Sequence, residues 1–282
     1  MKPTTAVIFA AGSGSRMLPI TAAVQKELMP ILNRPVIDYI VTDLVAAGIS
    51  RIIFVIRPGA TGLKDFYLGN ASYEATLQRL GKSAAVEALA QIHHQATFEF
   101  IEQPDDAGYG TAVPLRTVLP LLDPAEPVLV CGGDDFVWRT DGVSETAAFI
   151  DTYLASGAEG ALMSLELPED QLSKYGVLAT REDGGVTYLT DIVEKPAAGQ
   201  APSRLINISK YILSGAQRAS VTSVQPRAEV GESYITDAIL STLSEHPIAV
   251  HRITGTFLDT GNPASWLHAN QVIAATSTDL AK

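Results

Sequence analysis

An apolar run that ends in a glycine loop constrains the start of this chain more than any other feature. Residues 5–10 (TAVIFA) have the composition of a short buried strand, and the small residues 11–15 (AGSGS) follow at once. Because glycine has no Cβ, the backbone N–H groups of such a loop can approach a phosphate closely. Arg16 ends the loop and Lys26 follows ten residues later, so two cations can offset the phosphate charge. The segment is a candidate triphosphate site, although an ordinary strand-to-helix turn can contain the same two glycines.

The loop does not follow the two best-known phosphate-binding patterns. A Walker loop requires Gly-x-x-x-x-Gly-Lys-[Ser/Thr], and no lysine stands at that spacing here. The dinucleotide fingerprint requires a third glycine, where this chain has Met17. The two glycines alone do not define a ligand, so the hypothesis depends on Arg16 and Lys26.

Strand-like and helix-like segments alternate over the first 131 residues, which predicts a parallel sheet with helices on both faces. The expected strands are 51–56, 98–101 and 128–131, and the expected helices are 36–49, 73–94 (with a polar interruption at 81–82) and 110–122. After residue 160, strand-like segments follow one another at 161–167, 175–180, 186–194 and 206–213. We expect these to be antiparallel strands over one side of the first sheet. A helix at 234–244, a strand at 248–254 and a last helix opened by Asn262-Pro263 complete the pattern.

The predicted fold class is α/β: a Rossmann-like three-layer sandwich with a mixed, mostly parallel central sheet and an added antiparallel part. The sequence contains no internal repeat and no low-complexity linker. We therefore expect a single domain over 1–282, with a first half of about 1–158 and a second half of about 159–282. The 282 residues are enough to bury a substantial core.

Composition excludes several classes of protein. Hydrophobic residues make up 46% of the chain, but no run is long enough to span a bilayer, and residues 1–4 lack the apolar segment of a signal peptide. The single cysteine, Cys131, suits a reducing compartment, so we expect a cytoplasmic protein with no membrane partner. A net charge of −11 argues against nucleic-acid binding. Anionic small substrates remain compatible with this charge if cations gather in one cleft, because charges act locally within about 8 Å.

Four further segments carry polar groups with a chemical use. Residues 132–135 (GGDD) follow a buried strand, where α/β proteins bind ligands, and carboxylates there suit Mg²⁺. Asp259 precedes the last helix, and Gln103 can pair with the edge of a base through its amide. The pair Glu194-Lys195 suits a sugar hydroxyl and a phosphate. Each segment also has a plain structural explanation as a solvated turn, a helix cap or an exposed surface.

The glycine loop and the lysine segment that follows it resemble the signature of a known family. Residues 12–19 (GSGSRMLP) and 25–30 (QKELMP) are similar to the signature G-x-G-[TS]-R-x-x-P and P-K-x-x-x-P of the sugar-1-phosphate nucleotidylyltransferases. Within that family the chain resembles the bacterial UTP–glucose-1-phosphate uridylyltransferases from about residue 5 to about residue 275. The resemblance implies transfer of a uridylyl group from UTP to glucose 1-phosphate in carbohydrate biosynthesis, by a Mg²⁺-dependent in-line displacement that yields UDP-glucose and pyrophosphate. It also implies a homodimer or homotetramer.

Residue roles are implied by position in the family's motifs. The implied catalytic residues are Arg16, Lys26 and Lys195. The implied nucleotide contacts are Ala11, Gly12, Gly14, Gln103 and Gly108, with Gln103 and Gly108 on the uracil ring. The implied sugar contacts are Gly176, Glu194 and Lys195, which would make the second half of the chain the sugar-binding half. The implied Mg²⁺ ligands are Asp134 and, from the pattern at 257–261 (FLDTG), Asp259.

The chain departs from the family at four positions, and two other functions stay open. Gln25 replaces a usual proline, Thr111 a histidine, Ser209 a glycine and Tyr234 a polar residue. Because three of these changes lie around the expected base or sugar pockets, the sugar is less well defined than the reaction. One alternative is a nucleotidylyltransferase that uses dTTP or another sugar 1-phosphate, although the 73–94 segment resembles the uridylyltransferases. The other is a non-catalytic regulatory paralogue, which retention of the catalytic and metal positions argues against.

Overall fold

The computed structural model describes residues 1–277, and within them nine strands form one sheet. The strand order is β5 (Thr97–Glu102), β4 (Arg51–Ile56), β1 (Thr5–Ala10), β6 (Val128–Gly132), β11 (Leu205–Leu213), β8 (Gly160–Glu166), β12 (Ile248–Arg252), β10 (Val186–Glu194) and β9 (Gly176–Asp183). Two short strand pairs lie outside it: β2 (Pro30–Ile31) with β3 (Arg34–Pro35), and β7 (Asp135–Trp138) with β13 (Thr256–Asp259). Both halves of the chain therefore contribute to one continuous sheet.

The direction of the strands changes along the sheet. Strands β5, β4, β1 and β6 are parallel, as the alternation of segments predicts. Strand β11 enters antiparallel between β6 and β8, and β10 and β9 close the other edge antiparallel. The second group of strands does not lie over one side of the first sheet, as we expected. It extends the sheet, because β11 satisfies the hydrogen bonds of the β6 edge that would otherwise stay open.

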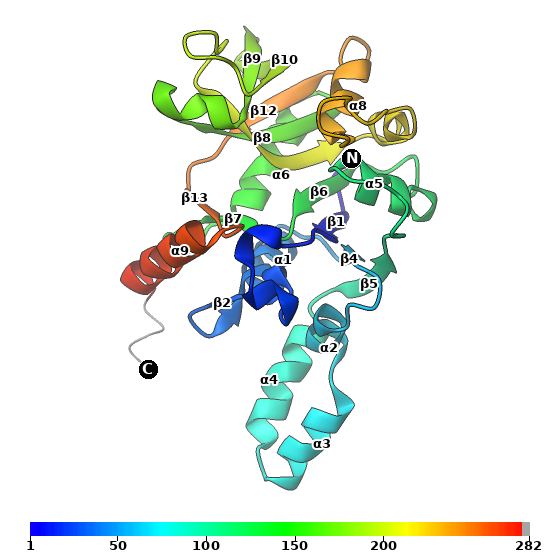
Figure 1. Ribbon diagram of the computed structural model, residues 1–282, viewed down its shortest axis with the longest axis vertical. Coiled ribbons are helices and arrows are strands. Elements are labelled where there is room, and N and C mark those ends of the chain that lie inside the picture. Colours follow the sequence, from blue (N-terminus) through cyan, green and yellow to red (C-terminus); the bar gives the residue numbers. More distant parts are fainter. Residues whose placement is uncertain (278–282) are drawn as a thin grey trace.

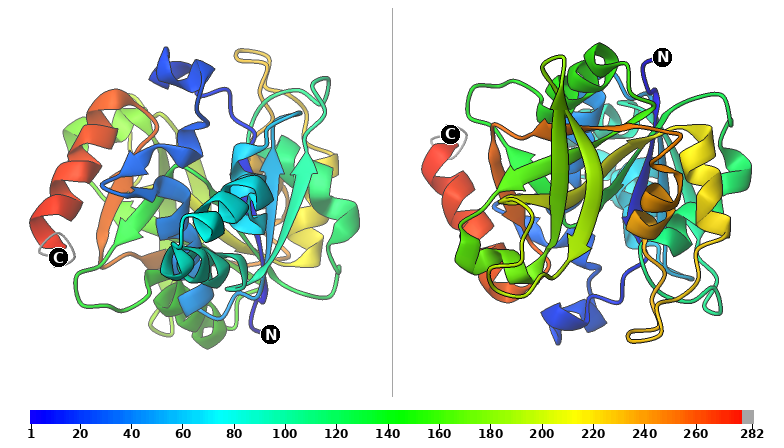
Figure 2. Two further views of the ribbon diagram at one scale, coloured as in Figure 1. Left: turned by 90° about the horizontal axis from the view of Figure 1, so that it is seen from below. Right: turned by 90° about the horizontal axis from the view of Figure 1, so that it is seen from above.

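Helices cover both faces of the sheet, because alternate residues of the buried strands point to opposite faces. In β1, Ile8 joins one apolar cluster and Val7 joins the other. The first cluster includes residues of α1 (Val36–Ala46), α6 (Glu145–Ser156) and α9 (Pro263–Thr276), and the second includes residues of α5 (Ala112–Val118) and α8 (Ile235–Thr242). Figure 2 shows α9 and α5 on opposite sides of the molecule. The remaining helices are α2 (Gly62–Leu68), α3 (Ala71–Arg79), α4 (Ser83–His93) and α7 (Gly215–Ala219).

Helix ends follow local signals in the sequence. The Asn262 side chain accepts a 3.1 Å hydrogen bond from the Ser265 N–H, so the predicted cap of the last helix is confirmed. The helical segment 73–94 divides into α3 and α4 at Gly81, whose φ is 70°. These two helices have no buried residue and project from the body (Figure 1). Among the described residues, no helix is both long and apolar enough to cross a membrane.

Candidate active site

The loop after β1 brings Lys26 against Gly12. A Cβ built on Gly12 would lie 3.2 Å from the Lys26 Nζ, so a side chain there would crowd the ammonium group. Gly14 instead makes the turn, with a φ of 65° and a 2.8 Å hydrogen bond from the Thr21 hydroxyl to its carbonyl. Ala11 and Gly12 line a cavity of about 510 Å³ that Gly14 does not line. The predicted loop therefore contains residues that face a ligand and one that shapes the backbone.

Lys26 is held among acids. Its Nζ donates a 2.7 Å hydrogen bond to Asp134 Oδ2 and lies 3.8 Å from Glu27 Oε1. Burial alone would lower the pKa of Lys26, but the negative charges of Asp134 and Glu27 outweigh burial and raise it. Lys26 is therefore a fixed positive charge at neutral pH, next to the acid that follows β6.

The pairing of β7 with β13 brings Asp134 and Asp259, the two predicted Mg²⁺ ligands, together. Asp135 is in register with Asp259 across these antiparallel strands. Thr260 then donates two hydrogen bonds to the Asp134 carbonyl, from its N–H at 2.9 Å and from its hydroxyl at 2.6 Å. The backbone of one acidic segment is thus fixed on that of the other, although 125 positions separate Asp134 from Asp259 in the sequence.

Arg16 meets both acids at Gly261. A Cβ built on Gly261 would lie 2.8 Å from Arg16 Nη2, 3.1 Å from Asp134 Oδ2 and 3.1 Å from Asp259 Oδ1. Within residues 1–277, no cluster of three or more His, Cys, Asp or Glu side chains has the geometry of a metal site. Two converging carboxylates still fit Mg²⁺, which binds one or two protein carboxylates and keeps several waters. Asp134 and Asp259 are therefore chemically suitable Mg²⁺ ligands.

Asp135 has a structural partner that the sequence did not reveal. Lys210 Nζ forms a buried ion pair with Asp135 Oδ1 and donates a 2.9 Å hydrogen bond to the Asp135 carbonyl. Burial is the largest influence on Asp135 and raises its pKa. A lysine within the apolar strand β11 (LINISKYIL) was the available signal, because a buried ammonium group needs an acidic partner.

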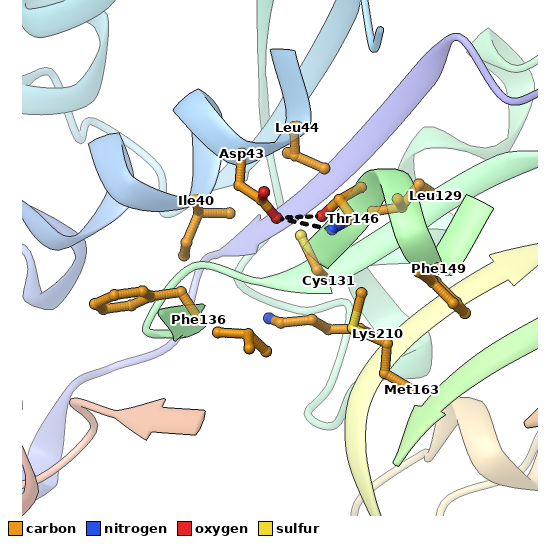
Figure 3. Close-up of a pocket in the computed structure, with 11 residues that line it drawn as sticks. Ile40, Asp43, Leu44, Leu129, Cys131, Phe136, Thr146, Phe149, Met163 and Lys210 are labelled. Carbon is orange, nitrogen blue, oxygen red and sulfur yellow. Dashed lines mark hydrogen bonds between the residues drawn. The ribbon is translucent and has the colours of Figure 1, made fainter. Parts of the chain in front are cut away.

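Lys210 also borders a small internal cavity (Figure 3). Its volume is about 20 Å³, enough for one water molecule and far too small for a nucleotide. Asp43 points toward it while accepting hydrogen bonds from the Thr146 N–H at 3.1 Å and hydroxyl at 2.6 Å, and buried Cys131 lies beside it (Figure 3). Burial raises the pKa of Cys131 to about 11, so the thiol is not a nucleophile at neutral pH.

Glu27 is a second residue that sequence reasoning missed. Its side chain is 1% exposed, and within the described residues its Oε1 has no hydrogen-bond partner. Burial raises the pKa of Glu27 to about 8. Glu27 also packs under the acidic turn, since a Cβ built on Gly133 would lie 2.9 Å from its Cγ. No sequence signal separates this buried acid from an exposed one beside a lysine.

Two open cavities meet at Gln103 and Tyr109. One, of about 420 Å³, is lined by Gln103 and Gly108. The other, of about 510 Å³, is lined by Arg16, Lys26 and Asp134 and also reaches Gln103. Ala11, Ser13, Gln103 and Tyr109 line both. The predicted base-reading glutamine thus lies where a compartment with room for a base joins the one that contains Arg16, Lys26 and Asp134.

Gly110 and Thr111 line the 510 Å³ cavity, and close contacts fix their positions. A Cβ on Gly110, whose φ is 106°, would clash with the Ser233 backbone at 2.2 Å. The Thr111 hydroxyl accepts a 3.0 Å hydrogen bond from the Ile235 N–H at the start of α8. Thr111, a departure from the family, therefore anchors the 231–235 segment to the cavity wall.

The predicted sugar residues lie on β9 and β10. Gly176 is paired with Glu194, and a Cβ on Gly176 would lie 2.9 Å from Glu194 Oε2. Lys195 follows with a φ of 46°, and its N–H donates a 3.0 Å hydrogen bond to the Tyr175 carbonyl. Neither Glu194 nor Lys195 lines the two cavities, and both are exposed. They lie beyond the cavities rather than in the cluster around Gly261.

Tyr234 closes the same region. Its ring lies under the Arg227 guanidinium at 4.6 Å, and Arg227 pairs with Asp237 through a 3.1 Å hydrogen bond from Nε. Burial is the largest of the influences that raise the pKa of Tyr234 to about 12, and the charge of Glu194 is a smaller one. Tyr234, another departure from the family, is thus a packed aromatic residue on the side of Glu194.

On a mixed α/β fold, a cavity large enough for a triphosphate contains Arg16, Lys26, Asp134 and the Gln103 amide, and Asp259 approaches Asp134 beside it. These are the groups that a nucleotidyltransferase needs. Comparison with known families agrees: residues 5–276 match the family described as nucleotidyl transferase, and the chain belongs to it.

The most similar curated relatives include UTP–glucose-1-phosphate uridylyltransferase YngB of Bacillus subtilis, which is 33% identical over 96% of this chain and 90% of its own. A putative UTP–glucose-1-phosphate uridylyltransferase of Methanocaldococcus jannaschii is 31% identical over 96% of this chain and 93% of its own. Among solved structures, a UTP-bound UGPase from Acinetobacter baumannii has a TM-score of 0.88 at 24% identity and covers 98% of this chain and 95% of its own. A UDP-glucose pyrophosphorylase complexed with UDP-glucose has a TM-score of 0.85 at 25% identity and covers 98% of this chain and 100% of its own.

Proposed function

We propose that this chain transfers a uridylyl group from UTP to glucose 1-phosphate and releases pyrophosphate. The observation that carries the proposal is the convergence of Arg16, Asp134 and Asp259 around Gly261, with Lys26 on Asp134. Arg16, Lys26 and Asp134 line a cavity that joins a second compartment, large enough for a base, at Gln103. The relatives named for this reaction span nearly the whole chain, which supports the substrates.

The reaction needs positioned charges more than acid–base groups. An anionic oxygen of the sugar phosphate attacks the α-phosphorus of UTP, a new P–O bond forms, and the bond to the β-phosphate breaks as pyrophosphate leaves. Because the nucleophile is already an anion, no general base is required. Catalysis then depends on holding two polyanions together and on stabilising the charge that develops.

Each charged residue has a place in this scheme. Arg16 stabilises the departing β- and γ-phosphates, and Lys26 bridges phosphate oxygens near the α-phosphorus. Lys195 holds the sugar phosphate, and Glu194 accepts hydrogen bonds from sugar hydroxyls beside Gly176. Ala11 and Gly12 offer backbone groups to the triphosphate, and Gly14 keeps the loop in its turn. Mg²⁺ held by Asp134 and Asp259 would neutralise charge on the phosphate oxygens.

The proposal extends to the organisation of the chain. In this proposal, residues about 1–158 serve as the nucleotide-binding half and residues about 159–282 as the sugar-binding half of one Rossmann-like domain. We further propose a cytoplasmic homodimer or homotetramer that supplies an activated sugar for carbohydrate biosynthesis. Sedimentation of the purified chain tests the oligomer independently of catalysis.

A substrate panel tests the function directly. Purified chain is incubated with each of UTP, dTTP, CTP, ATP and GTP against glucose, galactose and N-acetylglucosamine 1-phosphates with Mg²⁺, and pyrophosphate release is measured. We expect the highest kcat/KM for UTP with glucose 1-phosphate, and no release by a variant that carries both Asp134→Ala and Asp259→Ala. Preference for dTTP or for another sugar would redirect the substrate assignment, and no release in any combination would favour a non-catalytic paralogue.

A further inference from the structure

Strand β11 carries an irregularity where it borders the larger cavity. Asn207 is in register with Ser164 of β8, and Tyr211 with Leu162, so four steps on β11 match two on β8. Ser209 lies inside this bulge with a φ of 56°. The left-handed conformation is costly for a residue with a Cβ, whereas glycine adopts it freely. The strain alone does not show a use for the serine side chain, but it makes Ser209 a position to examine for one.

The hydrogen bonds around Ser209 have a defined direction. The Ser209 N–H donates to Asn207 Oδ1 at 3.0 Å, which turns the Asn207 amide so that its Nδ2 donates to the Tyr211 hydroxyl at 2.7 Å. Burial raises the pKa of Tyr211 to about 12, and hydrogen bonds from the Asn207 and Ser209 side chains partly offset it. The Tyr211 oxygen is therefore an acceptor for its neighbours, and its own proton is left to donate elsewhere.

Ser209 and Tyr211 both line the 510 Å³ cavity that contains Arg16, Lys26 and Asp134. Strand β11 also pairs with β9 through Ile206 and Val177, next to Gly176, which is paired with the predicted sugar carboxylate Glu194. Strand β11 therefore runs from the predicted sugar residues to the cavity. A sugar phosphate whose phosphate meets the cations of this cavity would have Ser209 and Tyr211 within the same walls. Lys210, between the two residues on β11, points away to Asp135.

We propose that Ser209 and Tyr211, held in place by Asn207, form a hydroxyl-reading wall that selects the sugar, with Ser209 as its specificity-determining residue. The inference rests on the proposed function. The wall is neutral and Glu194 carries a negative charge, so it suits a neutral hexose 1-phosphate and disfavours a uronic acid 1-phosphate. The Ser209 hydroxyl and the Tyr211 proton together give one ring hydroxyl both an acceptor and a donor.

Two substitutions of Ser209 separate the effect of its hydroxyl group on sugar binding from the effect of its strained backbone on stability. Ser209→Ala keeps the strained Cβ and removes the hydroxyl, and Ser209→Gly removes both. With saturating UTP, both should raise the KM for glucose 1-phosphate by about 2- to 12-fold, as expected for one neutral hydrogen bond, and should reduce discrimination against galactose 1-phosphate. The KM for UTP should stay unchanged, and only Ser209→Gly should melt at a higher temperature than wild type.

Leu32→Asn is the matched control, because Leu32 also has a left-handed φ of 54° but lines neither open cavity. It should leave the KM for the sugar phosphate unchanged. An active wild type whose KM and sugar preference are the same in both Ser209 variants overturns the inference and leaves the proposed function standing. A wild type that prefers glucuronic acid 1-phosphate also overturns the inference. A wild type that releases no pyrophosphate with any substrate refutes the proposed function and the inference with it.

Discussion

The Nζ of Lys26 lies 2.7 Å from the Oδ2 of Asp134, so the predicted phosphate-binding lysine is paired with a predicted Mg²⁺ ligand. The Lys26 ammonium group and the Asp134 carboxylate neutralise each other's charge. A polyphosphate and a divalent cation would bring a new partner to each of them. The ion pair therefore keeps two opposite charges in place at a site that is nearly buried on both sides, with side chains only 15% exposed.

Asp134→Ala and Asp259→Ala should each nearly abolish pyrophosphate release without unfolding the chain, because each removes a carboxylate from the Gly261 cluster. Activity is measured over a range of Mg²⁺ concentrations together with thermal melting. Asp135→Asn is the matched comparison: it breaks the buried pair with Lys210 and should cost about 3–5 kcal/mol of stability. Near wild-type rates of both alanine variants at limiting Mg²⁺ would show that the two carboxylates do not hold the metal.

Gly261→Ala should impair catalysis with little change in stability. The added methyl group would lie 2.8 Å from Arg16 Nη2, so the guanidinium must move away from the acids. A displacement of about 1 Å at a reacting centre can cost on the order of 10²-fold in rate. Gly184→Ala is the control, because it should strain the backbone without crowding any side chain: Gly184 has a φ of 58° and no atom within 4 Å of a Cβ. It should lower the melting temperature slightly and leave kcat/KM unchanged, and equal activity of both variants would remove Gly261 from the site.

The parallel strands of the sheet could be predicted from the sequence. Strands such as β1 and β4 are buried on both faces and therefore read as continuous apolar runs. The segment with α6 was not predicted, although Ser144 caps its start by accepting a 3.0 Å hydrogen bond from the Ala147 N–H. Strands β7 and β13 have only four residues each, too few for a periodic pattern.

Because the β7–β13 pairing could not be predicted, the sequence offers no physical reason for Asp134 and Asp259 to meet. The family resemblance named Asp134 and Asp259, but only the β7–β13 pairing explains how they meet. The Asp135–Lys210 ion pair depends on β11 entering beside β6, a long-range pairing that local patterns do not encode. The exposed positions of Glu194 and Lys195 depend in turn on β9 and β10 lying at the sheet edge.

Lys195→Ala should raise the KM for glucose 1-phosphate far more than that for UTP. Its backbone is fixed by the hydrogen bond to Tyr175, so the change removes mainly the ammonium group. A lost charge-assisted hydrogen bond costs roughly 1.5–3 kcal/mol, or about 10- to 150-fold in binding. Lys174→Ala, a nearby exposed lysine outside the motif, is the control and should change neither constant. Equal increases for both substrates would mean that Lys195 does not belong to the sugar half.

Stability should fall in acid through Glu145, a 1% exposed residue. Burial alone would raise its pKa, but hydrogen bonds from His251, Thr254 and Arg139 outweigh burial and lower the pKa to about 2. The folded-state pKa is thus below the ordinary value of 4.5. The stabilisation is fully present above pH 4.5 and is lost as the pH falls toward 2, and it amounts to about 3 kcal/mol.

Urea unfolding of wild type and Glu145→Gln between pH 6 and pH 2.5 checks this prediction. The variant should be less stable at pH 6 and should lose less stability over the acid range, because its amide does not titrate. Parallel stability curves for the two proteins would assign the acid sensitivity to other carboxylates.

Gln103 should distinguish uracil from cytosine, because its amide is free to face the base. Within residues 1–277 the side chain has no hydrogen-bond partner, while the Gln103 N–H donates to the Ile56 carbonyl at 2.9 Å and fixes the backbone. One amide can donate to O4 of uracil and accept from N3–H, and cytosine reverses both groups. Thymine keeps the same edge and adds one methyl group, worth only about 1–3 kcal/mol in a pocket. We therefore expect strong rejection of CTP and weaker rejection of dTTP.

Gln103→Glu is the sharpest test of this base-reading role, since a carboxylate has nearly the same shape but cannot donate to O4. It should lower kcat/KM for UTP while the KM for glucose 1-phosphate stays close to that of wild type. Gln200→Glu, an exposed glutamine that lines neither open cavity, is the matched control for the added charge. If wild type uses CTP as well as UTP, or if Gln103→Glu leaves UTP turnover unchanged, another group reads the base. Tyr109 and the backbone at Gly108, which line the same compartment, would then be the residues to change next.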